Sequence, residues 1–118
     1  MYDIKAVKIH NDLWNIETPF YFSDGDSVLL YLEQDYYSNY KITDKGHTLM
    51  HLSYVIDEKI VEQKAQRMAK NDKSTVHYKD EELYIDNVAF TKLHGHVINF
   101  YSFIDELSNK SLFIYQNQ

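Results

Sequence analysis

Apolar and polar residues alternate along the first part of the chain, a pattern typical of strands with one buried face. Val7 and Ile9 alternate with polar neighbours, and Trp14 and Ile16 do so after a turn-like Asn-Asp pair. The uninterrupted apolar run over residues 28–32 is instead typical of a strand covered on both faces. These patterns predict two short strands followed by a central strand, and then a turn into a further strand beginning at residue 40.

The period changes to three and four residues after position 46, which predicts helices. Apolar residues spaced in this way predict helical structure over about residues 47–70, with Asp57 as the cap of a second segment, and a second helix over about residues 88–108. Between them, two alternating stretches around Asp80-Glu81 predict a hairpin. Residues 111–118 are expected to form a tail or an edge strand.

We therefore expect an α+β fold. The 118 residues suffice for one domain, residues 1–118, in which a mostly antiparallel sheet of about four to six strands packs against two or three helices.

Composition narrows the functional classes. Apolar residues make up 44% of the chain, but no stretch approaches the ~20 apolar residues of a membrane helix, so we expect no membrane partner and a cytoplasmic location. Cysteine is absent, which excludes disulfides, thiolate ligands and a cysteine nucleophile. The formal net charge is −6 and Arg67 is the single arginine, so nucleic acid is not the expected partner.

One segment is basic and supports nucleic-acid binding as an alternative function. Residues 59–73 carry five cations and only two acids, the cations being Lys59, Lys64, Arg67, Lys70 and Lys73. This segment either forms a solvated helix surface whose cations suit the macrodipole or binds nucleic acid.

Acids and tyrosines gather at the predicted turns. Tyrosine occurs eleven times in the chain, and Tyr36, Tyr37 and Tyr40 surround one turn. This residue type is enriched where proteins bind one another, although it also fills cores and strands. The acids at the later turn are Asp80, Glu81, Glu82 and Asp86. The tyrosines and these acids are the expected partner-binding residues.

Metal and catalytic motifs are weak. His47 and His51 would share a helix face close to Asp44, which makes these three the candidates for a metal-dependent hydrolase, but a further ligand at helical spacing is missing. Asp24-Gly25-Asp26 is interpreted as an ordinary turn. We expect no metal, no cofactor and no enzymatic activity.

Three motifs resemble an uncharacterised bacterial and phage family of domains of unknown function. They are Thr18-Pro19-Phe20, Gly25-Asp26 before an apolar strand, and the stretch from Tyr40 through Ile42-Thr43-Asp44-Lys45-Gly46 to Leu49. The resemblance covers about residues 16–107. This chain departs from the family pattern at Lys45, where members carry a second aspartate. The resemblance implies a fold and an association with bacterial or mobile-element genes, and it supplies no catalytic residues.

The leading hypothesis is a small acidic protein-interaction module, an inhibitor of a host defence system from a phage or mobile element that binds another protein of the bacterial host, in one form by imitating nucleic acid. Homodimerisation is compatible with it. The alternatives are a nucleic-acid-associated module that uses residues 59–73 and a metal-dependent hydrolase.

Overall fold

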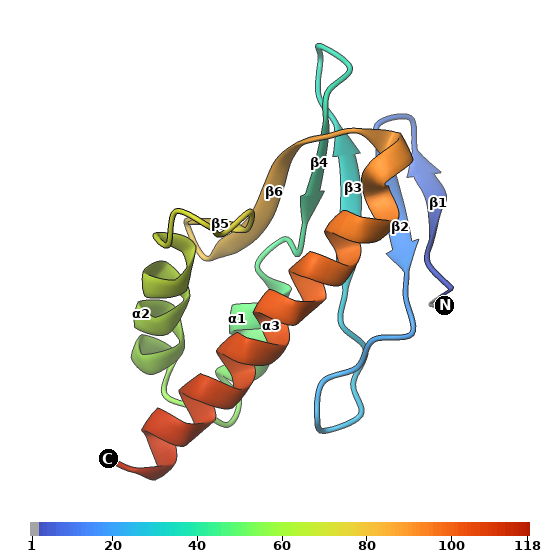
Figure 1. Cartoon of the computed structure of the whole chain (residues 1–118). Helices are drawn as coiled ribbons and strands as arrows, with labels where there is room; N and C mark the ends of the chain where they lie inside the picture. The colour runs from blue at the N-terminus through green and yellow to red at the C-terminus, as the bar shows by residue number, and fades with distance from the viewer. Residues whose placement is uncertain (1–2) are drawn as a thin grey trace.

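The computed structural model describes residues 3–118, which form a six-stranded antiparallel sheet and three α-helices (Figure 1). The strands lie in the order β1-β2-β3-β4-β6-β5. Their bounds are β1 (Lys5–His10), β2 (Leu13–Glu17), β3 (Leu30–Gln34), β4 (Tyr40–Thr43), β5 (His77–Lys79) and β6 (Glu82–Val88). The expected α+β class and antiparallel sheet are confirmed.

β3 and β4 form the centre of the sheet. Leu32 pairs with Ile42, which in turn pairs with Ile85, and all three side chains are buried on one face. β3 begins at Leu30, and its other face bears Tyr31 and Glu33, which are only partly buried. The predicted central strand is confirmed for residues 30–32. The expectation that both of its faces are covered is wrong, because the helices cover one face of the sheet.

The predicted helical stretch 47–70 consists of α1 (His47–Leu52) and α2 (Glu58–Ala69). Asp57 caps α2 as predicted, since its side chain accepts a 2.9 Å hydrogen bond from the amide of Lys59. A short 3₁₀ helix, η1 (Phe90–Lys92), then leads into α3 (Leu93–Gln116).

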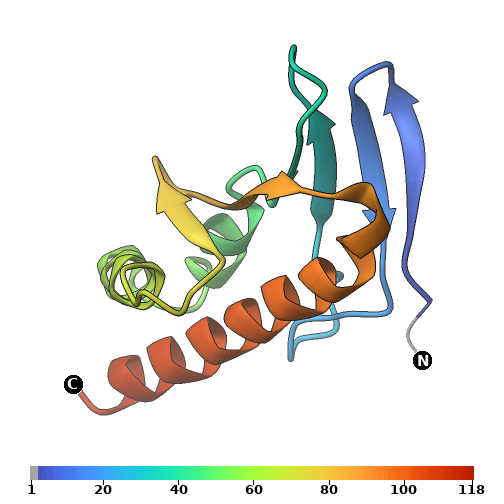
Figure 2. The ribbon, with the colours of Figure 1, turned by 45° about the horizontal axis from the view of Figure 1, so that its top comes forward.

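α3 runs along one side of the sheet and past α1 and α2 (Figures 1 and 2). Its buried side includes Val97, Phe100, Ile104 and Leu107, and the same side continues to the fully buried Ser111. The predicted end at residue 108 and the tail or edge strand over 111–118 are therefore wrong, since α3 continues to Gln116. No helix within residues 3–118 combines the length and hydrophobicity needed to cross a membrane.

The connection between β2 and β3 leaves the sheet and packs against the helices. The ring of Phe20 stacks on that of Tyr101 of α3 at 4.2 Å, and the ring of Phe22 stacks on that of His51 of α1 at 4.1 Å. A bridge between Tyr21 and Ser27 closes the loop that these contacts anchor. This loop carries Asp24 and Asp26 to α1.

Candidate functional site

The end of the β3–β4 hairpin presents two of the predicted tyrosines to solvent. Tyr36 is 94% exposed and Tyr37 is 81% exposed, and their rings meet edge to face with centroids 5.6 Å apart. The hairpin projects from the sheet (Figure 1). Both rings are therefore available for contact with another molecule.

Asp35 holds the turn that carries these tyrosines. Its carboxylate Oδ1 accepts hydrogen bonds from the amides of Tyr37 at 2.8 Å and Asn39 at 2.9 Å. Its own amide donates to the carbonyl of Asn39 at 2.9 Å, and Ser38 adopts the left-handed φ of 65° that closes the turn. The turn is thus organised before any partner arrives.

Tyr40 does not share this exposure. It is half-buried, with its ring 5.9 Å from that of Trp14 and 5.6 Å from that of Phe90. Tyr40 also borders a hollow of about 220 Å³ beside the hairpin, whose lining residues include Asp35 and Asp86. Of the predicted tyrosines, Tyr36 and Tyr37 fit a contact surface, whereas Tyr40 mainly packs.

A bulge in β6 brings Asp86 to that hollow. Tyr40 pairs with Val88 and Ile42 pairs with Ile85, so β6 has one residue more than β4 in this interval. Asn87 within the bulge has a φ of 54°. The extended strand β6 separates Asp86 from the other acids that were predicted together with it.

Those other acids lie at the opposite end of the hairpin formed by β5 and β6. Asp80 and Glu81 form its two-residue turn, with φ of 51° and 69°, and they border a shallow hollow together with Glu62 of α2. Burial and the Glu62 carboxylate raise the pKa of Tyr78 at the same place.

Glu82 is occupied by neighbours within the sheet. It accepts a hydrogen bond from the hydroxyl of Thr43 and forms a 3.3 Å ion pair with Lys41. The predicted acidic site is thus three separate places, of which only Asp80 and Glu81 stay together.

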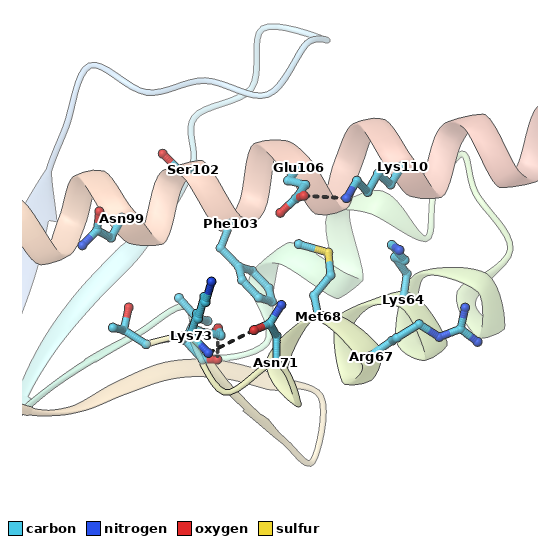
Figure 3. A pocket seen from close by; sticks show the side chains of 13 residues that line it. Lys64, Arg67, Met68, Asn71, Lys73, Asn99, Ser102, Phe103, Glu106 and Lys110 are labelled. Atoms are coloured by element: carbon cyan, nitrogen blue, oxygen red, sulfur yellow. Dashed lines mark hydrogen bonds and ion pairs between the residues drawn. The ribbon is translucent and has the colours of Figure 1, made fainter.

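Part of the predicted basic segment lines a groove of about 560 Å³ between α2 and α3 (Figure 3). Lys64, Arg67 and Lys73 border it, whereas Lys59 and Lys70 do not. The floor is apolar, because Met68 and Phe103 point toward each other between the helices (Figure 3).

The opposite wall of the groove comes from α3, and the sequence patterns did not predict it. It contributes Lys110 and Glu106, which form a 2.5 Å ion pair one helical turn apart, together with Asn99 and Ser102. The spacing 99, 102, 106 and 110 is a helical stripe that could have been found in the sequence. Only the packing of α2 on α3 shows that this stripe faces the α2 cations.

Asp44, a candidate metal ligand, is instead a buried structural group. Its carboxylate accepts hydrogen bonds from the amides of Gly46 at 2.8 Å, Leu83 at 3.1 Å and Thr48 at 3.3 Å. Burial raises the pKa of this carboxyl. Because these amides engage both oxygens, Asp44 secures the start of α1 to β6.

His51 lies near the carboxylates of Asp24 and Asp26, which the sequence favours as part of an ordinary turn over a cation site. Its Nε2 is 2.7 Å from an Asp24 oxygen and its Nδ1 is 3.7 Å from an Asp26 oxygen. One ligand atom from each of the three residues lies within 4.8 Å of the others. These residues could hold a divalent cation, although His51 is buried and both of its ring nitrogens already face carboxylates.

His47 stands beside this group without joining the cluster. Its ring centroid is 5.8 Å from that of His51, and burial together with His51 lowers the pKa of His47. The predicted trio of Asp44, His47 and His51 is therefore not assembled as a metal centre. Instead, the contacts of His51 with Asp24 and Asp26 connect α1 to the β2–β3 loop.

Comparison with known proteins adds a family but no activity. Neither the curated proteins nor the solved structures gave a match. The model of a domain of unknown function, DUF1828, matches residues 18–106, a range that includes β3 to β6, the helices α1 and α2 and the greater part of α3. The match covers well over half of the chain, and the chain therefore belongs to the DUF1828 family.

Proposed function

We propose that this chain is a non-enzymatic binding protein that contacts another protein through the end of its β3–β4 hairpin. The observation that carries the proposal is the exposure of Tyr36 and Tyr37, 94% and 81%, on a turn that Asp35 already holds in place. Tyrosine side chains lose little conformational freedom on binding and bury much area, so a preorganised pair is suited to anchor a complex.

The charges around this end favour a partner with lysine or arginine side chains at the contact. Glu33 pairs with Lys45 at 3.4 Å and Lys41 pairs with Glu82, so these charges offset one another. Among residues 3–118, Asp35 and Asp86 form no ion pair with a cation. A cationic side chain of the partner could pair with these carboxylates and lie over a tyrosine ring.

A double variant of the turn and a control variant of an exposed tyrosine elsewhere test this proposal. Wild-type protein, Tyr36→Ala/Tyr37→Ala and Tyr54→Ala are used to capture proteins from a bacterial lysate. Tyr54 is 77% exposed on the connection between α1 and α2, so it matches the chemistry but not the location. We expect the captured partner to be lost with the double variant and retained with Tyr54→Ala, because hot-spot truncations cost about 2 kcal/mol or more.

Two results would refute the proposal. One is a partner retained equally by all three proteins, and the other is no protein recovered above background with the wild type. Light scattering on the purified chain distinguishes a second copy of this chain as the partner.

The narrower proposal is that the bound protein is a nucleic-acid-binding component of a host defence system, inhibited by carboxylates that imitate phosphates. It is supported by the Asp80-Glu81 turn, where Glu62 adds a third carboxylate. Asp80→Asn/Glu81→Gln should weaken capture of the partner and flatten the salt dependence of its binding. Unchanged capture would refute the narrower proposal and leave only the proposal for the β3–β4 hairpin.

A further inference from the structure

We propose that the groove between α2 and α3 binds a small ligand that carries two or more phosphate groups, of about the size of a nucleotide. The groove lies apart from the Tyr36–Tyr37 turn, and this proposal does not depend on the one made for the hairpin. Its volume of about 560 Å³ falls within the range typical of small-molecule sites, about 300–1,000 Å³.

Charge is the first argument. Four cations line the groove, Lys64, Arg67, Lys73 and Lys110, against the single carboxylate of Glu106. That carboxylate pairs with Lys110, and among residues 3–118 the other three cations have no ion-pair partner. A positive hollow in a molecule of net charge −6 therefore offers an anion a local site.

The lining also supplies neutral hydrogen-bonding groups and an apolar floor. Asn71, Thr75, Asn99 and Ser102 border the groove, and Met68 and Phe103 lie between the helices. Phosphate oxygens accept from guanidinium, ammonium, amide and hydroxyl donors, while an apolar floor accommodates the uncharged part of such a ligand.

The loop at one end of the groove is already ordered. The Asn71 side chain accepts from the amide of Lys73 at 3.0 Å, and the Asn71 carbonyl accepts from the amide of Ser74 at 2.9 Å. The Ser74 hydroxyl donates to the carbonyl of Val76 at 2.8 Å. A ligand would therefore meet Lys73 on a fixed loop and would pay little for ordering it.

The helix macrodipole does not account for all of these cations. Arg67 is in the last turn of α2 and Lys73 follows it, so both also suit the negative end of the helix. Lys64 stands before that last turn, and Lys110 belongs to α3. Lys64 and Lys110 border the same groove because α2 packs against α3. The negative end of the α2 dipole does not explain their position.

A small ligand fits the charge distribution better than a nucleic-acid strand. Exposed acids flank the groove residues in sequence, since Glu58 begins α2, Asp72 follows its end and Asp105 precedes Glu106 on α3. A strand that extends beyond the groove would run along the surface of a molecule with a net charge of −6. A ligand confined to the groove would not.

Calorimetric titration of the full chain with ADP and with inorganic tripolyphosphate tests the proposal. We expect both to bind at low ionic strength. Arg67→Gln and Lys64→Gln should each weaken binding about tenfold, because each removes a charge-assisted hydrogen bond. Arg67→Lys should recover part of the loss, since it restores the charge without the planar fork.

Lys70→Gln is the matched control. Lys70 lies three residues after Arg67 at the end of α2 and does not line the groove, so its removal should leave the affinity within about twofold. Tyr36→Ala/Tyr37→Ala should also bind ADP normally, which separates this site from the hairpin. Circular dichroism confirms that each variant is folded, and Lys73→Gln on the loop replaces any variant that is not.

Three outcomes would overturn the proposal. The first is no heat from ADP or tripolyphosphate at low ionic strength. The second is an equal loss in Lys70→Gln and Arg67→Gln, which would indicate diffuse attraction. The third is a single-stranded DNA oligomer that binds more tightly than ADP with a steep salt dependence, which would make the groove a nucleic-acid site.

Discussion

The turn after β4 and the loop between β2 and β3 are both organised by an aspartate that accepts from the amide two residues later. Asp44 Oδ1 lies 2.8 Å from the amide of Gly46, and Asp24 Oδ1 lies 2.9 Å from the amide of Asp26. The pKa of Asp44 is raised because burial dominates. The pKa of Asp24 is lowered, first by the Asp26 amide and then by His51 as a partner.

This difference shows that one local motif serves two purposes according to its surroundings. The buried Asp44 joins α1 to β6 through three amides, so it is part of the folding frame. The exposed Asp24 holds a loop to α1 through a single ionisable partner, His51, and its contribution depends on pH. Three predictions test the distinction.

The largest effect is expected from Asp44→Ala. This change leaves the amides of Gly46, Thr48 and Leu83 without their acceptor, and unsatisfied buried donors cost about 1–3 kcal/mol each. We expect the free energy of unfolding, measured in urea, to fall by about 3 kcal/mol or more. Asp57→Ala, which removes the exposed cap of α2, is the control and should cost about 1 kcal/mol. Equal losses in the two variants would contradict a special role of Asp44.

A smaller effect is expected from the titration of Asp44. The folded-state pKa lies above the ordinary value of 3.8, so the unfolded chain releases this proton first as the pH rises. Asp44 therefore stabilises the fold most at pH below 3.8, and part of that stabilisation is lost as the pH rises through the folded-state pKa. The stability difference between wild type and Asp44→Asn should shrink over this window in urea titrations at several pH values. A difference that grows with pH would show that the shift has the opposite sign.

The smallest effect is expected from Asp24→Asn. The Asp24 pKa is lowered in the folded state, so its contribution is present above pH 3.8 and is lost as the pH falls through the folded-state pKa. The variant keeps an acceptor for the Asp26 amide and loses only the charge opposite His51. We expect wild type and variant to become equally stable in acid and to differ slightly near neutral pH, as measured by thermal unfolding. A difference that persists in acid would indicate that Asp24 acts through packing rather than charge.

Local patterns predicted most of the elements but not all of their ends. Alternation located the hairpin around Asp80-Glu81, and Asp57 marked the break between α1 and α2. The end of α3 was predicted too early because residues 112–115 form a continuous apolar run, which has no helical period of its own. The helix nevertheless continues past this point, and Leu107 and Ser111 are both buried on its inner side.

The candidate sites were harder to predict because they depend on contacts distant in sequence. Asp24 and His51 are 27 positions apart, and Lys110 reaches the α2 cations only across the groove. Asp86 and Asp80 are close in sequence, yet Asp80 lies in the turn before β6 and Asp86 lies towards the other end of that extended strand. The spacing of residues along one helix or strand predicts which side chains share a face. Which other element packs against that face depends on the fold.

Arg67 combines two features described above, since it lines the groove and is the single arginine of the chain. An arginine-selective reagent such as phenylglyoxal can therefore modify this protein at one side chain, and that side chain faces the groove. Its labelling rate becomes a direct readout of groove occupancy. Screening compounds for protection against labelling would then identify ligands of the groove without any knowledge of a biological activity.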